Sequence, residues 1–251
     1  MQQVINKLLD DFEISDIECG SVQFFLDKNN VTVHKNILIT DIAKKNKGNI
    51  LKIKGFLQSK LNIFSINDLQ KIFESLIPPK DRKINGAFFT PCLITDYITS
   101  ELVKSDNQKI CDPSCGCGAF LVATIKLLNN KFNKSIADII EDNIFGIDIL
   151  DYSVRRCKII LSLLALVNKE DKESYAFNIR QFDSLNADWS KEFPSIMKNG
   201  GFDILVGNPP YVKYQDLSDK IRKELYENWL TLKTGTYNIY FAFFELGMKL
   251  L

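Results

Sequence analysis

Four consecutive residues, Asn208-Pro209-Pro210-Tyr211, follow a short apolar run and could bind a planar amino group. The run contains Ile-Leu-Val at 204–206, which predicts a short buried strand that a glycine and the two prolines end. Two consecutive prolines fix φ and supply no N–H, so they hold the Asn208 side chain and the Pro209 carbonyl in a stiff, extended turn.

Two acceptors side by side, with an aromatic ring beyond them, suit a substrate that carries an NH₂ group. The Asn208 side-chain oxygen and the Pro209 carbonyl would accept its two protons, and the Tyr211 ring would stack on its plane. By itself the tetrapeptide is equally well explained as a strand-ending turn with an incidental tyrosine. The other motifs of the chain bear on this choice.

A second motif is the glycine-containing turn at residues 112–118, Asp-Pro-Ser-Cys-Gly-Cys-Gly, between a predicted strand and an apolar helix. Gly116 and Gly118 let the backbone approach a ligand closely and leave the helix N-terminus open to polar groups. No third glycine stands at dinucleotide spacing, so the turn does not match a nicotinamide or flavin fingerprint. The cysteines in and beside the turn lack a further pair of metal ligands and are interpreted as small buried thiols rather than as a zinc site.

Two more acids end predicted strands: Asp148 follows residues 144–147, and Asp183 follows residues 177–182. An acid at the first position could accept both hydroxyl groups of a ribose, and an acid at the second could accept from an adenine amino group. Alone, Asp148 is better explained as a helix N-cap, and Asp183 could be a simple turn residue. Together with Asp112, however, three acids end three successive strands ahead of the Asn-Pro-Pro-Tyr turn, an order that chance rarely produces.

Strands and helices alternate from residue 84 onward. The predicted strands are residues 109–111, 144–147, 177–182 and 204–206, and the predicted helices are residues 120–128, 152–167, 217–230 and 237–251. This order predicts an α/β fold with a doubly wound, mostly parallel sheet. Ligands of such sheets bind beyond the carboxyl ends of the strands, where each of the motifs falls.

The first 83 residues differ from the rest in charge pattern. Residues 10–18 are acidic, whereas residues 42–67 contain six lysines and no acid. A helix is expected after Asn67, which would be its N-cap, and residues 78–83 are interpreted as a linker. The lysines are interpreted as a solvated face, with contacts to DNA phosphates as the alternative.

Composition restricts the class of protein. The 251 residues are 45% apolar and 25% charged with a net charge of +1, which is typical of globular proteins and leaves room only for a local basic surface. No apolar run approaches membrane-spanning length, and six scattered cysteines without a disulfide framework favour a reducing cytoplasm. His34, the only histidine, is interpreted as incidental in a strand-like stretch at 31–34, so histidine-based metal sites and triads are nearly excluded.

Five motifs, in order along the chain, resemble those of amino-group adenine DNA methyltransferases, in the gamma-ordered group of type I modification subunits and fused restriction–modification enzymes. They are Gly86-Ala87-Phe88-Phe89-Thr90-Pro91, Asp112-Pro113-Ser114-Cys115-Gly116-Cys117-Gly118-Ala119-Phe120, Gly146-Ile147-Asp148, Phe182-Asp183 and Asn208-Pro209-Pro210-Tyr211. The resemblance implies an S-adenosylmethionine-dependent methyltransferase domain over residues 84–251. Residues 1–83 resemble, loosely, the helical N-terminal segments of those enzymes, which implies a smaller and mainly helical segment.

The resemblance also implies a cofactor, S-adenosylmethionine, and a role for each motif. The first motif lies beside the methionine moiety, the glycine-containing turn cradles the cofactor, Asp148 holds the ribose and Asp183 contacts the cofactor adenine. No metal is implied. The implied cofactor-binding residues are Phe89, Thr90, Pro91, Asp112, Pro113, Cys115, Gly116, Gly118, Asp148, Ile149 and Asp183, and the implied catalytic residues are Asn208, Pro209, Pro210 and Tyr211.

The chemistry of adenine fits these residue types. Its exocyclic amine is a poor nucleophile because the nitrogen lone pair is delocalised into the ring. By accepting the amine protons, Asn208 and the Pro209 carbonyl favour a pyramidal nitrogen and stabilise the positive charge that grows during attack on a sulfonium methyl group. Tyr211 would stack on a base rotated out of the duplex. The expected function is methylation of adenine in double-stranded DNA, as part of a restriction–modification system.

Two further expectations concern completeness and alternatives. The family's sheet has seven strands, so three strands and the target-recognition region are expected to be absent, with the strand ending at Val206 left as an exposed apolar edge. Another chain or a missing C-terminal region would then complete the enzyme.

The alternatives are methylation of a protein glutamine or an RNA base, since the motif serves any planar NH₂ group, and a cofactor-binding or assembly module without catalysis. The Phe-Phe-Thr-Pro element at 88–91 favours DNA.

Overall fold

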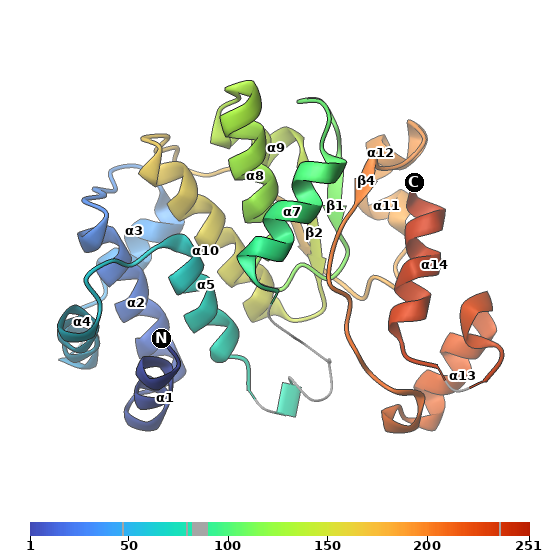
Figure 1. Cartoon of the computed structure of the whole chain (residues 1–251), viewed down its shortest axis with the longest axis horizontal. Coiled ribbons are helices and arrows are strands. Elements are labelled where there is room, and N and C mark those ends of the chain that lie inside the picture. The colour runs from blue at the N-terminus through green and yellow to red at the C-terminus, as the bar shows by residue number, and fades with distance from the viewer. Residues whose placement is uncertain (47, 79, 82–89, 236) are drawn as a thin grey trace.

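The computed structural model describes residues 1–46, 48–78, 80–81, 90–235 and 237–251 (Figure 1). Four parallel strands organise this part of the chain, in the spatial order β3-β2-β1-β4. They are β1 (Ile110–Asp112), β2 (Ile144–Asp148), β3 (Asn178–Gln181) and β4 (Ile204–Leu205). Ile110 of β1 pairs with Ile144 of β2 on one side and with Ile204 of β4 on the other. Because successive strands are added in opposite directions on the two sides of β1, the crevice beyond β1 and β4 is the switch point where open α/β sheets bind ligands.

Alternate side chains of the strands face two hydrophobic clusters, one on each side of the sheet. Ile110 and Ile144 belong to the cluster that contains apolar residues of the helices α8 (Ala119–Phe132) and α10 (Asp151–Val167). Cys111 and Phe145, the next residue along each strand, belong to the other cluster with residues of α11 (Trp189–Glu192) and α14 (Tyr240–Leu250). Helices therefore cover both faces, and the predicted doubly wound α/β fold is confirmed.

The other elements of this half complete the two layers. They are α7 (Cys92–Leu102), α9 (Ile136–Asp142), α12 (Pro194–Lys198), α13 (Asp219–Asn228) and the short 3₁₀ helices η1 (Tyr214–Asp216) and η2 (Leu230–Leu232). Figure 1 shows α13 and α14 on one side of the sheet and the N-terminal helices on the other. Within the described part of the chain, none of the helices is both long enough and apolar enough to span a membrane.

Each strand differs from its predicted range by one residue at one or both ends. β3 ends at Gln181 rather than at residue 182, because Asp183 accepts a hydrogen bond from the Leu185 N–H and turns the chain out of the sheet. β4 lies at the edge of the sheet that the described residues form, as expected. The apolar run is not exposed, however: Ile204 in the strand is 7% accessible and Val206, just after the strand, is 6% accessible, because helices cover both faces.

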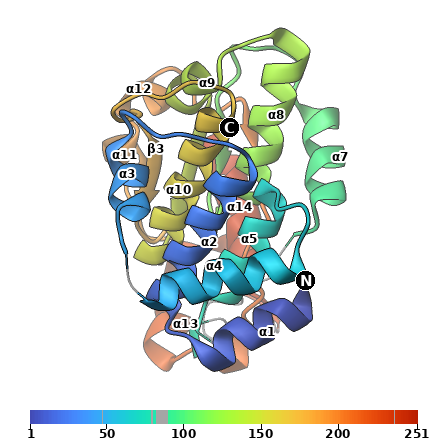
Figure 2. The same cartoon turned by 90° about the vertical axis from the view of Figure 1, so that its left-hand side faces the viewer.

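Helices make up most of the N-terminal segment that the structure describes. They include α1 (Gln2–Asp11), α2 (Ile14–Lys28), α3 (Ile37–Ala43), α4 (Gly48–Lys60) and α5 (Ile66–Ser75). Figure 2 shows this side of the molecule facing the viewer, with α2 and α5 beside α10, and both helices contribute to the same hydrophobic cluster as α8 and α10. The segment is thus mainly helical and shares a core with the sheet. The predicted domain boundary between residues 83 and 84, and half of the predicted linker at residues 78–83, lie outside the described residues.

Two local predictions in this segment are wrong. Residues 31–34 form no strand; instead the backbone N–H groups of His34, Lys35 and Asn36 all donate to the Asp171 carboxylate, at 2.7 to 3.0 Å, in a turn before α3. The N-cap of α5 is Ser65 and not Asn67. Ser65 is the N-cap because Asp68 forms a reciprocal capping box with it, which satisfies two backbone donors at once.

A buried ion pair joins the N-terminal segment to the helix that follows β2. Glu18 of α2 lies 3.0 Å from Arg156 Nε of α10, with the two side chains 6% and 4% accessible, and Arg155 also pairs with Glu18. Arg156 further donates to the Phe73 carbonyl of α5 at 3.3 Å. The guanidinium group therefore ties α2, α5 and α10 together at one buried point.

We expect Glu18→Ala to lower the free energy of unfolding by about 3–5 kcal/mol, because it leaves the Arg156 guanidinium buried without a counter-charge. Lys7→Ala is the matched control, since it breaks the exposed Lys7–Asp11 pair and should cost no more than about 1 kcal/mol. Urea denaturation followed by circular dichroism measures both values. Equal effects of the two substitutions would contradict a structural role for the buried pair.

Candidate active site

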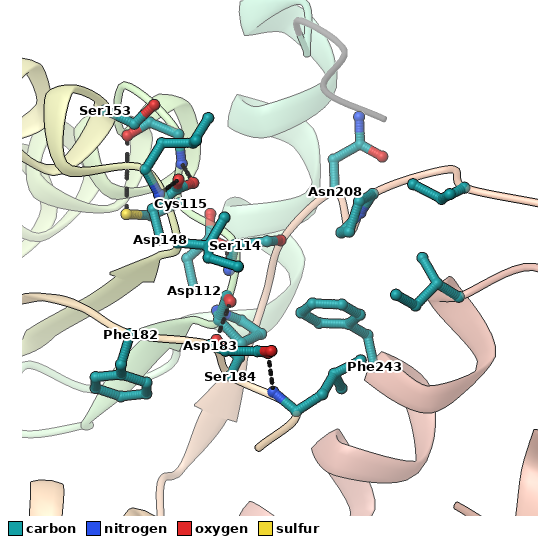
Figure 3. Close-up of a pocket in the computed structure, with 18 of the residues that line it drawn as sticks. Asp112, Ser114, Cys115, Asp148, Ser153, Phe182, Asp183, Ser184, Asn208 and Phe243 are labelled. Atoms are coloured by element: carbon teal, nitrogen blue, oxygen red, sulfur yellow. Dashed lines mark hydrogen bonds between the residues drawn. The ribbon is translucent and has the colours of Figure 1, made fainter. Parts of the chain in front are cut away.

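A cavity of about 770 Å³ lies beyond the carboxyl ends of the four strands (Figure 3). Its wall contains ten of the residues predicted to bind cofactor or substrate: Thr90, Asp112, Pro113, Cys115, Gly116, Asp148, Ile149, Asp183, Asn208 and Pro210. Four others lie outside its lining: Pro91 and Gly118 are the N-caps of α7 and α8, and Pro209 and Tyr211 flank Pro210 in the turn. Phe89 lies outside the described residues. The motifs thus meet at one cavity, although Thr90 and Asn208, for example, are 118 residues apart in the sequence.

The glycine-containing turn begins the cavity wall at the end of β1. Gly116 and Gly118 have φ values of +53° and +84°, in the left-handed region that favours glycine. The Cys115 N–H donates to the Ile147 carbonyl of β2 at 2.8 Å, which anchors the turn to the neighbouring strand. The turn is thereby held open over the ends of β1 and β2.

Asp148 ends β2 and holds the same turn from the side. Its carboxylate accepts the Gly116 N–H and the Leu150 N–H, each at 2.9 Å. The N-cap of α10 is Leu150, so Asp148 is not itself the cap. Burial raises the pKa of Asp148, and these two hydrogen bonds counteract the shift. A carboxylate has about four lone-pair sites, so acceptor capacity for a ligand remains at the cavity wall.

Asp112 and Gly207 approach each other closely across β1 and β4. A Cβ atom built on Gly207 would lie 2.5 Å from Asp112 Oδ1 and 3.2 Å from Asp112 Cγ. Asp112 is 2% accessible and accepts the Ser114 N–H at 3.0 Å, so its carboxyl cannot move away freely. Only glycine fits at 207, immediately before Asn208. Burial raises the pKa of Asp112 to about 7, with a further contribution from the Asp148 charge.

Asn208 lies between the cavity and the protein surface. Its Nδ2 donates to Thr90 Oγ1 at 3.1 Å, which orients the side-chain amide and leaves its oxygen to accept other donors. The Tyr211 ring is 49% accessible and lies 5.7 Å from the Tyr240 ring, centroid to centroid. Behind the turn, the Tyr214 N–H donates to the Tyr237 carbonyl at 3.0 Å, so the segment just before α14 supports the chain that carries Asn208.

Asp183 closes the far side of the cavity. It accepts from the Leu185 N–H at 3.0 Å and from the Asn186 amide at 2.8 Å. Ser184 Oγ donates to the Pro113 carbonyl at 2.6 Å, which links the turn after β3 to the turn after β1. Hydrogen bonds therefore connect the turns that follow β1, β2 and β3.

The cysteines around the turn are buried thiols, as interpreted from the sequence. Cys111, Cys115, Cys117 and Cys157 are buried and unpaired by disulfides. A hydrogen bond with the Cys157 thiol, together with burial, raises the pKa of Cys115. Among the described residues, no group of three or more potential ligands is arranged to hold a metal ion.

Sequence reasoning missed several wall residues. Ser114, Phe182 and Ser184 stand inside or beside the predicted motifs, so their position was available from the sequence. Glu74 and Phe243 come from α5 and α14, and no local pattern marks them. Burial raises the pKa of Glu74, whose Oε1 accepts the Cys117 N–H at 3.2 Å.

The charge of the wall has one sign. Among the described residues that line the cavity there are six acids and no lysine, arginine or histidine; the acids are Glu74, Asp112, Asp148, Asp183, Asp216 and Glu224. Ser114 Oγ is buried there without a hydrogen-bond partner among the described residues. A cavity of this size, with one-sided charge and an unsatisfied hydroxyl, is suited to a small cationic ligand.

The sequence model of the Eco57I restriction-modification methylase family matches residues 142–251. The methylase subunit of the type I restriction enzyme MpnII from Mycoplasma pneumoniae is 24% identical over 209 residues, covering 81% of this chain and 34% of that protein. The type II methyltransferase M.HincII from Haemophilus influenzae is 28% identical over 150 residues, covering 59% of this chain and 22% of that protein. The chain therefore spans about a third or less of the length of these relatives.

The fold is shared with a solved restriction–modification enzyme. The type IIL enzyme MmeI, in complex with DNA, superposes with a TM-score of 0.58 at 16% identity, covering 84% of this chain and 35% of that chain. The comparisons confirm the resemblance that the ordered motifs predict: the chain is similar to methyltransferases of restriction–modification systems.

The raised pKa of Asp112 predicts a pH-dependent contribution to stability. Because the folded-state pKa of about 7 lies above the ordinary value of 3.8, this contribution is fully present below the ordinary value and is lost as pH rises through about 7. Asp112→Asn stays neutral, so the Tm of the variant minus that of the wild type should rise from about pH 5 to about pH 8.

Thermal unfolding in matched buffers measures this difference. Asp142→Asn, at a side chain that is 60% accessible, is the control. A difference for Asp112→Asn that stays constant or falls over the range would contradict a raised pKa at this carboxyl.

Proposed function

We propose that the chain carries the cofactor site and the amine-binding turn of an adenine-specific DNA methyltransferase, acting with S-adenosylmethionine in a restriction–modification system. The observation that carries the proposal is the position of Asn208. It stands at the switch point of the sheet, with its amide fixed by Thr90, between an acid-lined cavity and the exposed ring of Tyr211.

The cavity fits S-adenosylmethionine on charge and size. The cofactor carries a sulfonium and an ammonium group, which the six wall acids would favour over an anionic ligand. Asp148 would hold the ribose of the cofactor, and Asp183 would contact its adenine. Asp112, the turn at residues 113–118 and Thr90 would bind its methionine end. When bound, the cofactor supplies an electrophilic methyl group. The unsatisfied Ser114 hydroxyl is a further contact in this assignment.

Asn208 and Pro209 would prepare the substrate amine. The side-chain oxygen of Asn208 and the Pro209 carbonyl accept the two amine protons, which frees the nitrogen lone pair and stabilises its developing positive charge. The half-exposed Tyr211 ring would stack on a base brought from outside the cavity. No strong base is required, which agrees with a chain that contains one histidine, distant in sequence from these motifs.

A second surface supports DNA as the substrate. A groove of about 540 Å³ lies beside α13. Its lining includes three basic side chains, one acidic side chain and three tyrosines: Arg222, Lys223, Lys233, Asp219, Tyr214, Tyr226 and Tyr237. Arg222 stacks over the Tyr214 ring at 5.0 Å, three residues beyond Tyr211 in sequence. Glu224 and Leu225 line the acidic cavity while Lys223 and Tyr226 line the groove, so α13 separates the two surfaces. Basic side chains can neutralise DNA phosphates, and aromatic rings among them can stack on nucleobases, so this groove suits a nucleic acid.

The proposal assigns residues 1–83 as an N-terminal segment and residues 84–251 as the methyltransferase domain. It also places the protein in the cytoplasm, where its DNA would be, and the six free cysteines agree with a reducing compartment. The relatives are longer, so further regions or subunits would take part in target recognition.

In the enzyme completed by the further regions or subunits, we expect Asn208→Ala to abolish methyl transfer to DNA while S-adenosylmethionine affinity stays within about twofold, because Asn208 contacts the incoming amine and so acts on the transition state. Tyr211→Phe, which keeps the ring, is the control and should remain active. Transfer of a labelled methyl group to unmethylated DNA, followed by nucleoside analysis, measures both. Methylation of RNA or of a protein glutamine in place of DNA adenine would contradict the assigned substrate.

Two lysines of the groove provide a separate test of DNA binding. The double substitution Lys223→Ala and Lys233→Ala should reduce the slope of log affinity for DNA against log salt by roughly 1.8, at about 0.9 for each phosphate that is no longer neutralised. The control pair, Lys52→Ala and Lys60→Ala, removes exposed lysines of α4. Fluorescence anisotropy with duplex DNA measures the slopes. A larger reduction of the slope in the control pair would move the DNA-binding surface to the N-terminal segment.

A further inference from the structure

We propose that helix α5 of the N-terminal segment contributes to the cofactor site. Its residues Glu74 and Gln70 act as positioning residues for the glycine-containing turn at residues 112–118. The inference rests on the proposed function for the identity of the ligand. Neither side chain belongs to the motifs that resemble the family.

The two side chains bind the same residue of the turn. Glu74 Oε1 accepts the Cys117 N–H at 3.2 Å, and Gln70 Nε2 donates to the Cys117 carbonyl at 3.4 Å. Residues four apart on a helix lie on one face, so α5 presents a matched acceptor and donor to both backbone groups of Cys117. Gln70 is 5% accessible, and the contact is therefore shielded from water.

Cys117 is the point at which the turn needs support. It stands between the two glycines with positive φ, Gly116 and Gly118, which are the most freely rotating positions of the turn. The Gly116 N–H is held from β2 by Asp148, and the Cys117 peptide groups are held from α5. A Cβ on Gly116 would lie 3.4 Å from Glu74 Oε1, so the carboxyl packs directly against the turn.

The position of α5 is in turn fixed by α10. Arg156 donates to the Phe73 carbonyl, next to Glu74, at 3.3 Å, and its guanidinium carbon lies 5.9 Å from the Phe73 ring centroid. α10 begins three residues after Asp148. Helix α5 therefore connects the turn after β1 to the helix after β2, the two sides of the cofactor cavity, and Glu74 itself forms part of the cavity wall.

Hydrogen–deuterium exchange of the ligand-free protein tests the contact directly. Glu74→Ala should raise the exchange rate in residues 112–118 about tenfold, the equivalent of one lost buried hydrogen bond. Glu74→Gln keeps an acceptor oxygen and should leave the rate near that of the wild type. Lys71→Ala, on the exposed side of the same helix, is the matched control and should have no effect. Unchanged exchange in Glu74→Ala would overturn the proposal.

Calorimetric titration with S-adenosylmethionine tests the consequence for the site. Glu74→Ala should weaken binding about tenfold, and Glu74→Gln, which keeps the hydrogen-bond acceptor and loses only the charge, should weaken it clearly less. Equal weakening in both variants would show that the Glu74 charge contacts the ligand, which would overturn the positioning role. If Glu74→Ala fails to fold, Gln70→Ala takes its place in both measurements with the same expected direction. If the wild type does not bind S-adenosylmethionine, the proposed function fails, and the exchange measurement still decides the contact with the turn.

Discussion

The close approach of β4 to the end of β1 is the constraint on which the site depends. Parallel pairing of these two strands brings residue 207 so near to the Asp112 carboxyl that a Cβ atom would clash with it. Glycine at 207 permits the approach, and the next residue, Asn208, then emerges at the mouth of the cavity. The turn at residues 208–211 would bind the substrate amine, and the turn at residues 112–118 would bind the methyl donor. The two turns are neighbours because glycine at 207 permits this contact. The other strand ends add to the frame through Asp148 and Ser184, whose hydrogen bonds reach the same glycine-containing turn.

Burial of acids at this frame carries an electrostatic cost that a cationic ligand would offset. Burial raises the pKa of Asp112, Asp148 and Glu74, so each carboxyl is held in a site that disfavours its charge. Backbone N–H groups counteract the shift at each of them. Such perturbed groups, gathered in one cavity, are typical of functional sites rather than of packing alone. The opposite face of α13 carries Arg222 and Lys223, two of the three basic side chains of the groove, so a single helix separates a region suited to a cation from one suited to a polyanion.

Much of the sheet and of the cavity wall could be predicted from the sequence, because the information is local. The four strands, the two turns, Asp148 and Asn208 each lie in short segments whose residue types encode their geometry. The capping box at Ser65 and Asp68 is also local, and it makes Ser65 the N-cap of α5 in place of the predicted Asn67. The strand expected at His34 failed because Asp171, more than 130 residues away, gathers three backbone donors there. Glu74 and Gln70 could not be found from local pattern, since their partner lies more than 40 residues away.

The central claim is that the acid-lined cavity at the switch point binds S-adenosylmethionine through Asp148. Isothermal titration calorimetry of the wild type and of Asp148→Ala tests it most directly. The account predicts measurable binding to the wild type and a loss of about 1–3 kcal/mol in the variant, from the lost acceptor for the ribose hydroxyls together with the released Gly116 N–H. Absence of binding to the wild type, or equal affinity in the two proteins, would contradict it.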